Sequence, residues 1–195
     1  MPSSMLVHDT RLSGTAPATA RNTYRVNASV PLRGALGWIS TYARMHKGLT
    51  QLSIMCHGYE GGVSDGRVGV SANELGFGPA FCREGLTLAN VNLTACLDGL
   101  VELIMLYACG PARTRPGFEG TVADGGEFCR ELAGWTGAEV LAAVETQYYI
   151  KEPRSGILSR LFRIGAQDTI NFGAWEGQLY RFTPDGTVMP TTGNW

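Results

Sequence analysis

Residues 101–110 read Val-Glu-Leu-Ile-Met-Leu-Tyr-Ala-Cys-Gly, and residues 51–58 read Gln-Leu-Ser-Ile-Met-Cys-His-Gly. Each stretch is an apolar run about as long as one buried strand, and each ends in a reactive side chain followed by glycine. Ligands of an open α/β sheet bind outside the carboxyl ends of its strands. Two neighbouring parallel strands that end in His57 and Cys109 would therefore place an imidazole beside a thiol.

A third apolar run, residues 138–144, extends this pattern. Apolar residues recur at helical spacing in the segment before each of the three runs, at 31–47, 89–99 and 124–135. Alternating strands and helices predict a parallel sheet. We therefore expect an α/β fold, a three-layer sandwich whose mostly parallel central sheet has about five or six strands and helices on both faces. The strands at 51–56, 102–108 and 138–144 should lie side by side in its middle.

The remaining segments predict one domain with an extension. Residues 1–29 are rich in Ser, Thr, Pro and Ala, and we interpret them as an N-terminal arm with one short strand at 5–8 and with His8 at the surface. Residues 30–195 fit a single domain, because a chain of this length buries a full core by itself. Its smaller predicted elements are a glycine-rich loop at 58–66, a strand at 67–71 that makes a hairpin beside the site, a helix at 156–163 and a strand at 178–182 followed by a turn.

Composition argues against several classes of function. The formal net charge is -1 and no segment concentrates Lys and Arg, so we expect no nucleic-acid partner. The longest apolar run is about half of what a bilayer span requires, which argues against a membrane protein. The first residues lack the basic-then-apolar order of a secretory signal, so we expect a cytoplasmic protein; export by another route stays open.

The cysteines and histidines predict neither disulfides nor a metal site. Five cysteines form no C-x-x-C pair, and an odd number cannot all pair within one chain, which favours a reducing compartment. The three histidines lie far apart in the sequence, without the spacing of a zinc site. We therefore expect no metal and no cofactor.

His57 and Cys109 are candidates for catalysis because a thiol attacks a carbonyl as the thiolate, and an imidazole can take its proton and later protonate the leaving amine. Gly58 would let a substrate backbone approach closely, and the amides of Gly58 and Cys109 would stabilise an oxyanion. Cys56 alternates to the opposite face of its strand. The other three thiols are expected to be small buried or surface groups: Cys82, Cys96 and Cys129.

The Ser-Ile-Met-Cys-His-Gly block at 53–58 and the Ala-Cys-Gly block at 108–110 together resemble the caspase-like cysteine peptidases of clan CD, in which a His-Gly block and an Ala-Cys block end adjacent strands. The separation here is 109 − 57 = 52 residues, similar to the caspase spacing of about 50. The run Gly-Glu-Phe-Cys-Arg-Glu-Leu-Ala-Gly-Trp-Thr-Gly-Ala-Glu-Val at 126–140 is similar to one that follows the cysteine block in a bacterial caspase-like domain found at the start of large surface proteins. The likeness covers about residues 30–145.

This resemblance implies a caspase-like fold and a cysteine endopeptidase that cleaves a protein or peptide substrate. His57 carries over as general base and acid, Cys109 as the nucleophile, and the amides of Gly58 and Cys109 as oxyanion donors. Two alternatives stay open. One is a non-catalytic interaction or scaffold module in which His57 and Cys109 are remnants, and the other is an acyl-transfer hydrolase that uses the same dyad on a non-peptide substrate. The sequence does not decide the oligomeric state.

Tyr107 is the candidate wall of the substrate pocket. It stands two residues before Cys109 and so emerges on the same face of the strand. In caspase-like peptidases this position helps to line the pocket for the residue before the cut, and carries a charged or amide side chain. A phenol there predicts no strict basic or acidic selectivity, unless Asp65 or Asp124 from the flanking loops supplies a carboxylate to the pocket.

Overall fold

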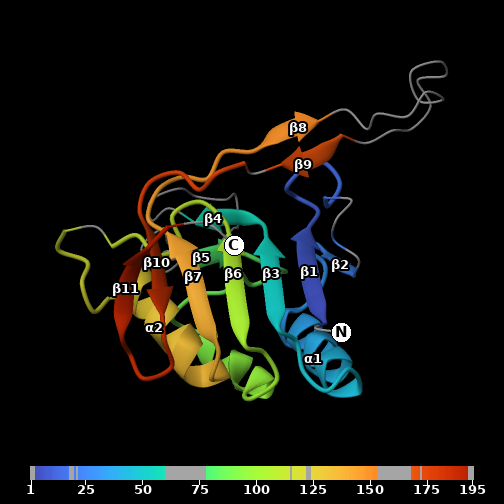
Figure 1. Cartoon of the computed structure of the whole chain (residues 1–195), viewed down its shortest axis with the longest axis horizontal. Coiled ribbons are helices and arrows are strands. Elements are labelled where there is room, and N and C mark those ends of the chain that lie inside the picture. The colour runs from blue at the N-terminus through green and yellow to red at the C-terminus, as the bar shows by residue number, and fades with distance from the viewer. Residues whose placement is uncertain are drawn as a thin grey trace.

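The continuous apolar runs form the middle of a seven-stranded sheet in the computed structural model of the chain (Figure 1). The structure describes residues 3–17, 20, 22–59, 78–114, 116–121, 124–152, 168–171 and 173–192. The strand order is β11-β10-β7-β6-β3-β1-β2. The strands are β1 (Ser4–Asp9), β2 (Thr23–Val26), β3 (Gln51–Met55), β6 (Leu103–Tyr107), β7 (Glu139–Ala143), β10 (Leu179–Phe182) and β11 (Val188–Thr191).

Five neighbouring strands, from β2 to β7, are parallel, and β10 and β11 continue the sheet in antiparallel fashion. β3, β6 and β7 are consecutive neighbours, with Leu52 opposite Ile104 and Leu106 opposite Ala142. The α/β class, the mostly parallel sheet and the adjacency of the three central strands are therefore confirmed.

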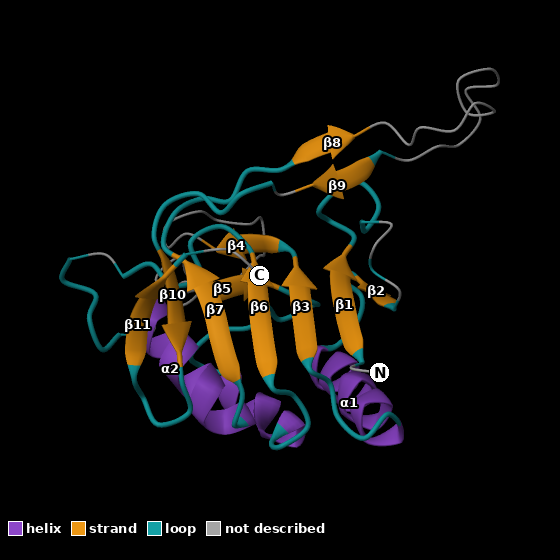
Figure 2. Ribbon diagram, in the orientation of Figure 1, coloured by secondary structure: helices purple, strands orange, loops and turns teal. Residues whose placement is uncertain are grey.

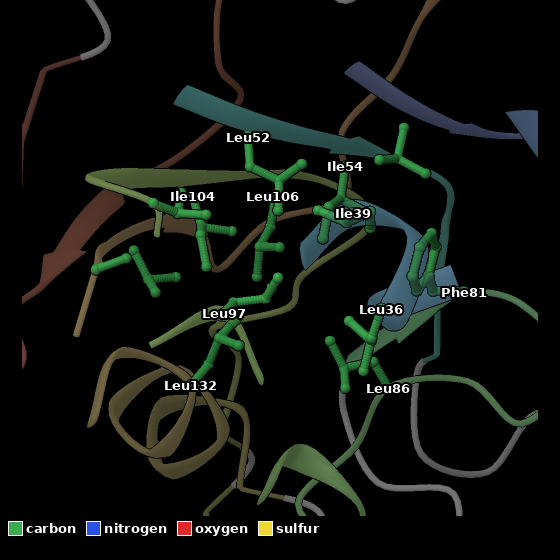
Figure 3. Close-up of a cluster of buried hydrophobic side chains, with 14 of the residues drawn as sticks. Leu36, Ile39, Leu52, Ile54, Phe81, Leu86, Leu97, Ile104, Leu106 and Leu132 are labelled. Atoms are coloured by element: carbon green, nitrogen blue, oxygen red, sulfur yellow. The ribbon is translucent and has the colours of Figure 1, made fainter. Parts of the chain in front are cut away.

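Three helices cover one face of this sheet: α1 (Leu32–Met45), the 3-10 helix η1 (Val91–Leu97) and α2 (Gly125–Thr136). Figure 3 shows Leu97 of η1 beside Leu106 of the sheet, and one hydrophobic cluster joins the buried apolar side chains of all three helices to those of the sheet. The described helices form one layer (Figure 2). Within the described residues, the helices predicted for both faces are therefore found on one face only.

The segment predicted as a helix at 89–99 is a 3-10 helix because its short polar side chains bond to nearby backbone. Thr94 Oγ1 donates to Val91 O at 2.6 Å, and Asn90 Oδ1 accepts from Thr87 N at 2.9 Å. Side chains that bond locally in this way compete with regular α-helix.

A second, smaller hydrophobic cluster lies away from the helices and joins Leu6, Leu12, Met55 and Ile170, with Tyr107 packed against it. Ile170 belongs to β9 (Thr169–Asn171), which pairs with β8 (Ile150–Glu152) beyond the carboxyl ends of the strands (Figure 1). The segment after β7 therefore returns across the end of the sheet where the candidate site lies.

The N-terminal segment is part of the sheet. β1 lies between β2 and β3, so the predicted arm of residues 1–29 is not a loose extension. The expectation that His8 lies at the surface is wrong, because its side chain is 1% exposed and its Nε2 lies 2.8 Å from Leu12 O. The short strand expected at 5–8 is confirmed as β1, which has six residues and pairs in parallel on both sides.

The other predicted elements have mixed outcomes. The strand at 178–182 is confirmed as β10, and a turn connects it to β11. The loop beyond residue 59, the strand at 67–71 and the helix at 156–163 lie outside the described residues. None of the described helices has the length and apolar character that crossing a bilayer requires.

Candidate active site at the carboxyl ends of β3 and β6

β3 and β6 end side by side, and their backbones are in contact. Cys56 N donates to Tyr107 O at 3.1 Å just after the last pair of the ladder. A Cβ added to Gly58 would lie 2.0 Å from Cys109 O and 2.7 Å from Cys109 N. We expected Gly58 to admit a substrate backbone, but here its missing side chain admits the backbone of Cys109.

His57 begins the short strand β4 (His57–Tyr59), which pairs in antiparallel fashion with β5 (Gly78–Ala80). Its side chain is exposed, and its Nε2 lies 3.3 Å from the main-chain oxygen of Arg11. A carbonyl oxygen only accepts hydrogen bonds, so Nε2 must carry the proton in this contact. Nδ1 is then the basic nitrogen of the neutral ring.

Cys109 is half-buried and follows β6 directly. Its Sγ lies 3.9 Å from Gln147 O, in the segment after β7. Gly110, with φ of 53°, turns the chain away, and its amide donates to Glu145 O at 3.0 Å. Among the described residues the amide of Cys109 makes no such backbone bond.

The side chains of His57 and Cys109, which we expected beside each other, form no direct hydrogen bond in the structure. The imidazole contacts a carbonyl after β1, whereas the thiol contacts a carbonyl after β7. The two residues are neighbours through their backbones, and their side chains bond to groups on opposite sides of the β3–β6 pair.

Burial raises the pKa of four of the five thiols. Cys56 belongs to the cluster under the helices, as its alternation predicted, and burial raises its pKa well above the ordinary value. Burial also raises the pKa of Cys82 to about 12 and raises the pKa of Cys96 and Cys129. These four thiols are held in the protonated form at neutral pH, so they make poor nucleophiles.

Tyr107 lies against an aromatic partner that the sequence did not suggest. Its ring stacks on Trp175, with centroids 4.7 Å apart and planes 18° apart, and burial raises the pKa of its hydroxyl. The side chain of Gln147 binds the residue after Trp175: its Nε2 donates to Glu176 O at 2.9 Å, and its Oε1 accepts from Glu176 N at 3.2 Å. One face of the expected pocket wall is therefore covered by Trp175.

Asp124, a candidate for the pocket, is the N-cap of α2. Its Oδ1 accepts from Glu127 N at 2.9 Å and from Thr114 Oγ1 at 2.6 Å, and its Oδ2 accepts from Gly120 N at 2.9 Å. Burial would raise the pKa of this carboxyl, but these hydrogen bonds outweigh burial and lower it. Asp65 lies outside the described residues.

Sequence reasoning missed Arg11, Gln147 and Trp175, which surround the site. Each reaches it by contacts between distant segments, which local periodicity does not report. A weak signal existed for Arg11, since Asp9-Thr-Arg follows the strand predicted at 5–8 and so stands at a strand end.

No group of three or more His, Cys, Asp or Glu side chains in the described ranges is arranged to hold a metal ion. Comparison of the chain with protein-family models, with curated protein sequences and with solved structures found no match.

Proposed function

We propose that the chain is a cysteine endopeptidase in which Cys109 is the nucleophile and His57 the general base and acid. The observation that carries this proposal is the contact between His57 Nε2 and Arg11 O at 3.3 Å. A catalytic imidazole needs a third group that fixes its ring and tautomer, and a main-chain carbonyl does this by accepting from Nε2. Nδ1 is then left as the base on the ring that follows β3, beside the strand that ends in Cys109.

The chemistry follows from these positions. His57 accepts the thiol proton, the Cys109 thiolate attacks the substrate carbonyl, and the imidazolium returns a proton to the leaving amine. A water molecule, deprotonated by His57, then hydrolyses the thioester and releases the acid and the free thiol. The amide of Cys109 is suited to stabilise both tetrahedral intermediates with that of Gly58, because it has no backbone acceptor among the described residues.

The proposal includes a caspase-like, three-layer fold and a protein or peptide substrate. It is supported by the parallel order β1-β3-β6-β7, with His after β3 and Cys after β6. The Tyr107–Trp175 stack supplies an aromatic wall on the Cys109 face of β6. All five cysteines are free, which favours action in the reducing cytoplasm.

The alternative is a non-catalytic interaction module on the same fold. The observation that favours it is the divergence of the two side chains, since Cys109 Sγ bonds toward Gln147 O and not toward His57. In substrate-free enzymes catalytic hydrogen bonds are often long, so this geometry by itself does not exclude the enzyme.

Alkylation of the thiols tests the proposal. The full chain is treated with limiting iodoacetamide and with a peptide electrophile across a pH series, and mass spectrometry locates the modified cysteine. We expect Cys109 to react first, faster than free cysteine, and His57→Ala to abolish that advantage. Cys96→Ala is the matched control, because Cys96 is half-buried like Cys109 and stands away from His57 on η1. If Cys109 reacts no faster than free cysteine in the wild-type chain, the site is not catalytic.

A further inference from the structure

Asp9, the last residue of β1, is a fully buried carboxylate with an unusually complete set of partners. Arg11 forms a two-point ion pair with it, with Nε to Oδ1 at 2.9 Å and Nη2 to Oδ2 at 2.7 Å. The amide of Arg11 donates to Oδ1 at 3.2 Å, and the amide of Cys82 donates to Oδ2 at 3.0 Å. A carboxylate removed from water in this way is tolerated only because its charge and its lone pairs are matched.

The same pair fixes the segment that contains β5. Arg11 Nη2 also donates to Ala80 O at 2.7 Å and to Cys82 O at 2.8 Å. Cys82 is fully buried and has φ of 60°, a conformation that a residue with a Cβ rarely adopts. The contacts from Asp9 and Arg11 to its amide and carbonyl hold it there.

Two connections lead from this pair to His57. Through the backbone, Arg11 O accepts from the imidazole Nε2. Through the side chain, Arg11 holds Ala80, which is the β5 partner of His57 in the β4–β5 ladder. Both the ring and the strand that carries His57 therefore depend on where Asp9 keeps Arg11.

We infer that Asp9 and Arg11 are positioning residues that set the orientation and the Nε2–H tautomer of His57. Neither touches a reacting atom; both act through the imidazole. The catalytic consequence rests on the proposed function, whereas the tautomer does not. Disruption of the pair should release the ring and lower kcat by about 10–100-fold, the cost of a misplacement on the order of 1 Å. KM should stay within about twofold, because β3 separates β1, which carries Asp9, from β6, which carries the proposed substrate wall at Tyr107.

Nitrogen NMR of the full chain labelled with 15N-histidine tests this inference. His57→Ala assigns the His57 signals, and His46, the C-cap residue of α1, serves as the internal reference. We expect the Nε2–H form at His57 in the wild-type chain and a mixture of tautomers in two variants. Asp9→Asn keeps the shape of the side chain but removes its charge, and Arg11→Lys keeps the charge but loses the two-point geometry of the guanidinium. Arg130→Lys on α2, whose guanidinium pairs with Glu127, is the matched control and should change nothing.

The outcomes separate the two proposals. An Nδ1–H form at His57 in the wild-type chain overturns the inference without any variant, which matters if the substitutions prevent folding. An unchanged tautomer in a folded Asp9→Asn or Arg11→Lys chain also overturns it. A shifted tautomer in a chain without peptidase activity supports the positioning role and refutes the endopeptidase. A shifted tautomer together with a loss of kcat supports both.

Discussion

Gly58→Ala tests the closest contact in the site. The added Cβ would lie 2.0 Å from Cys109 O, which is 1.4 Å short of the 3.4 Å at which ordinary contact begins. It would also lie 2.7 Å from Cys109 C and N, so all three obstructing atoms are backbone and cannot rotate away. Overpacking of this kind costs about 1–3 kcal/mol, and we expect the upper end. For a chain of this size that corresponds to a fall in Tm of about 6–12 °C.

Thermal unfolding followed by circular dichroism measures this effect. Gly34→Ala is the control, because Gly34 is exposed on α1 and an added Cβ would meet nothing within 4 Å. The control should stabilise the chain by about 0.5–1 kcal/mol, since alanine favours helix. Peptidase activity of Gly58→Ala should fall about 100-fold, because the two strand ends are forced apart by roughly 1 Å. A fall in Tm of less than about 2 °C would show that the backbone accommodates the added Cβ and that this contact does not require glycine.

Three further predictions concern other residues. Cys109→Ala should abolish cleavage and change Tm by less than about 2 °C, because the thiol lies at a strand end. Cys96→Ala should leave cleavage intact, and equal loss of activity in both variants would point to structural roles. Asp124→Ala should cost about 2 kcal/mol by removing the cap of α2. Because folding lowers the pKa of Asp124, the stability that its carboxylate adds is complete above about pH 4 and is lost as pH falls through the folded pKa. Asp124→Asn keeps the cap but does not titrate, so its urea midpoint should lack this loss at acid pH. Tyr107→Asp should move a broad peptide-library profile toward basic residues, and an absolute preference of the wild-type chain for Arg or Lys would contradict the role given to Tyr107.

The sequence by itself determined the middle of the sheet and the two candidate catalytic positions. A parallel strand buried on both faces must be apolar throughout, so the runs before His57 and Cys109 are readable without any partner. The order of strands and helices makes the chain connections right-handed and brings successive strands together, which predicts that the two residues are neighbours. The N-cap role of Asp124 was also readable, since Asp followed three residues later by Glu127 is a capping pattern; we gave it a pocket role instead.

Only the tertiary structure decided how these positions are used. Gly58 packs on Cys109, Arg11 binds both Asp9 and His57, and Trp175 covers Tyr107. Each is a contact between segments far apart in the chain. The free energy of such a contact comes from desolvation and geometry where the two segments touch, so neither segment shows a residue pattern that predicts it. His8 shows the same limit, because a short strand in a polar segment is buried by its neighbours β2 and β3 and not by its own composition.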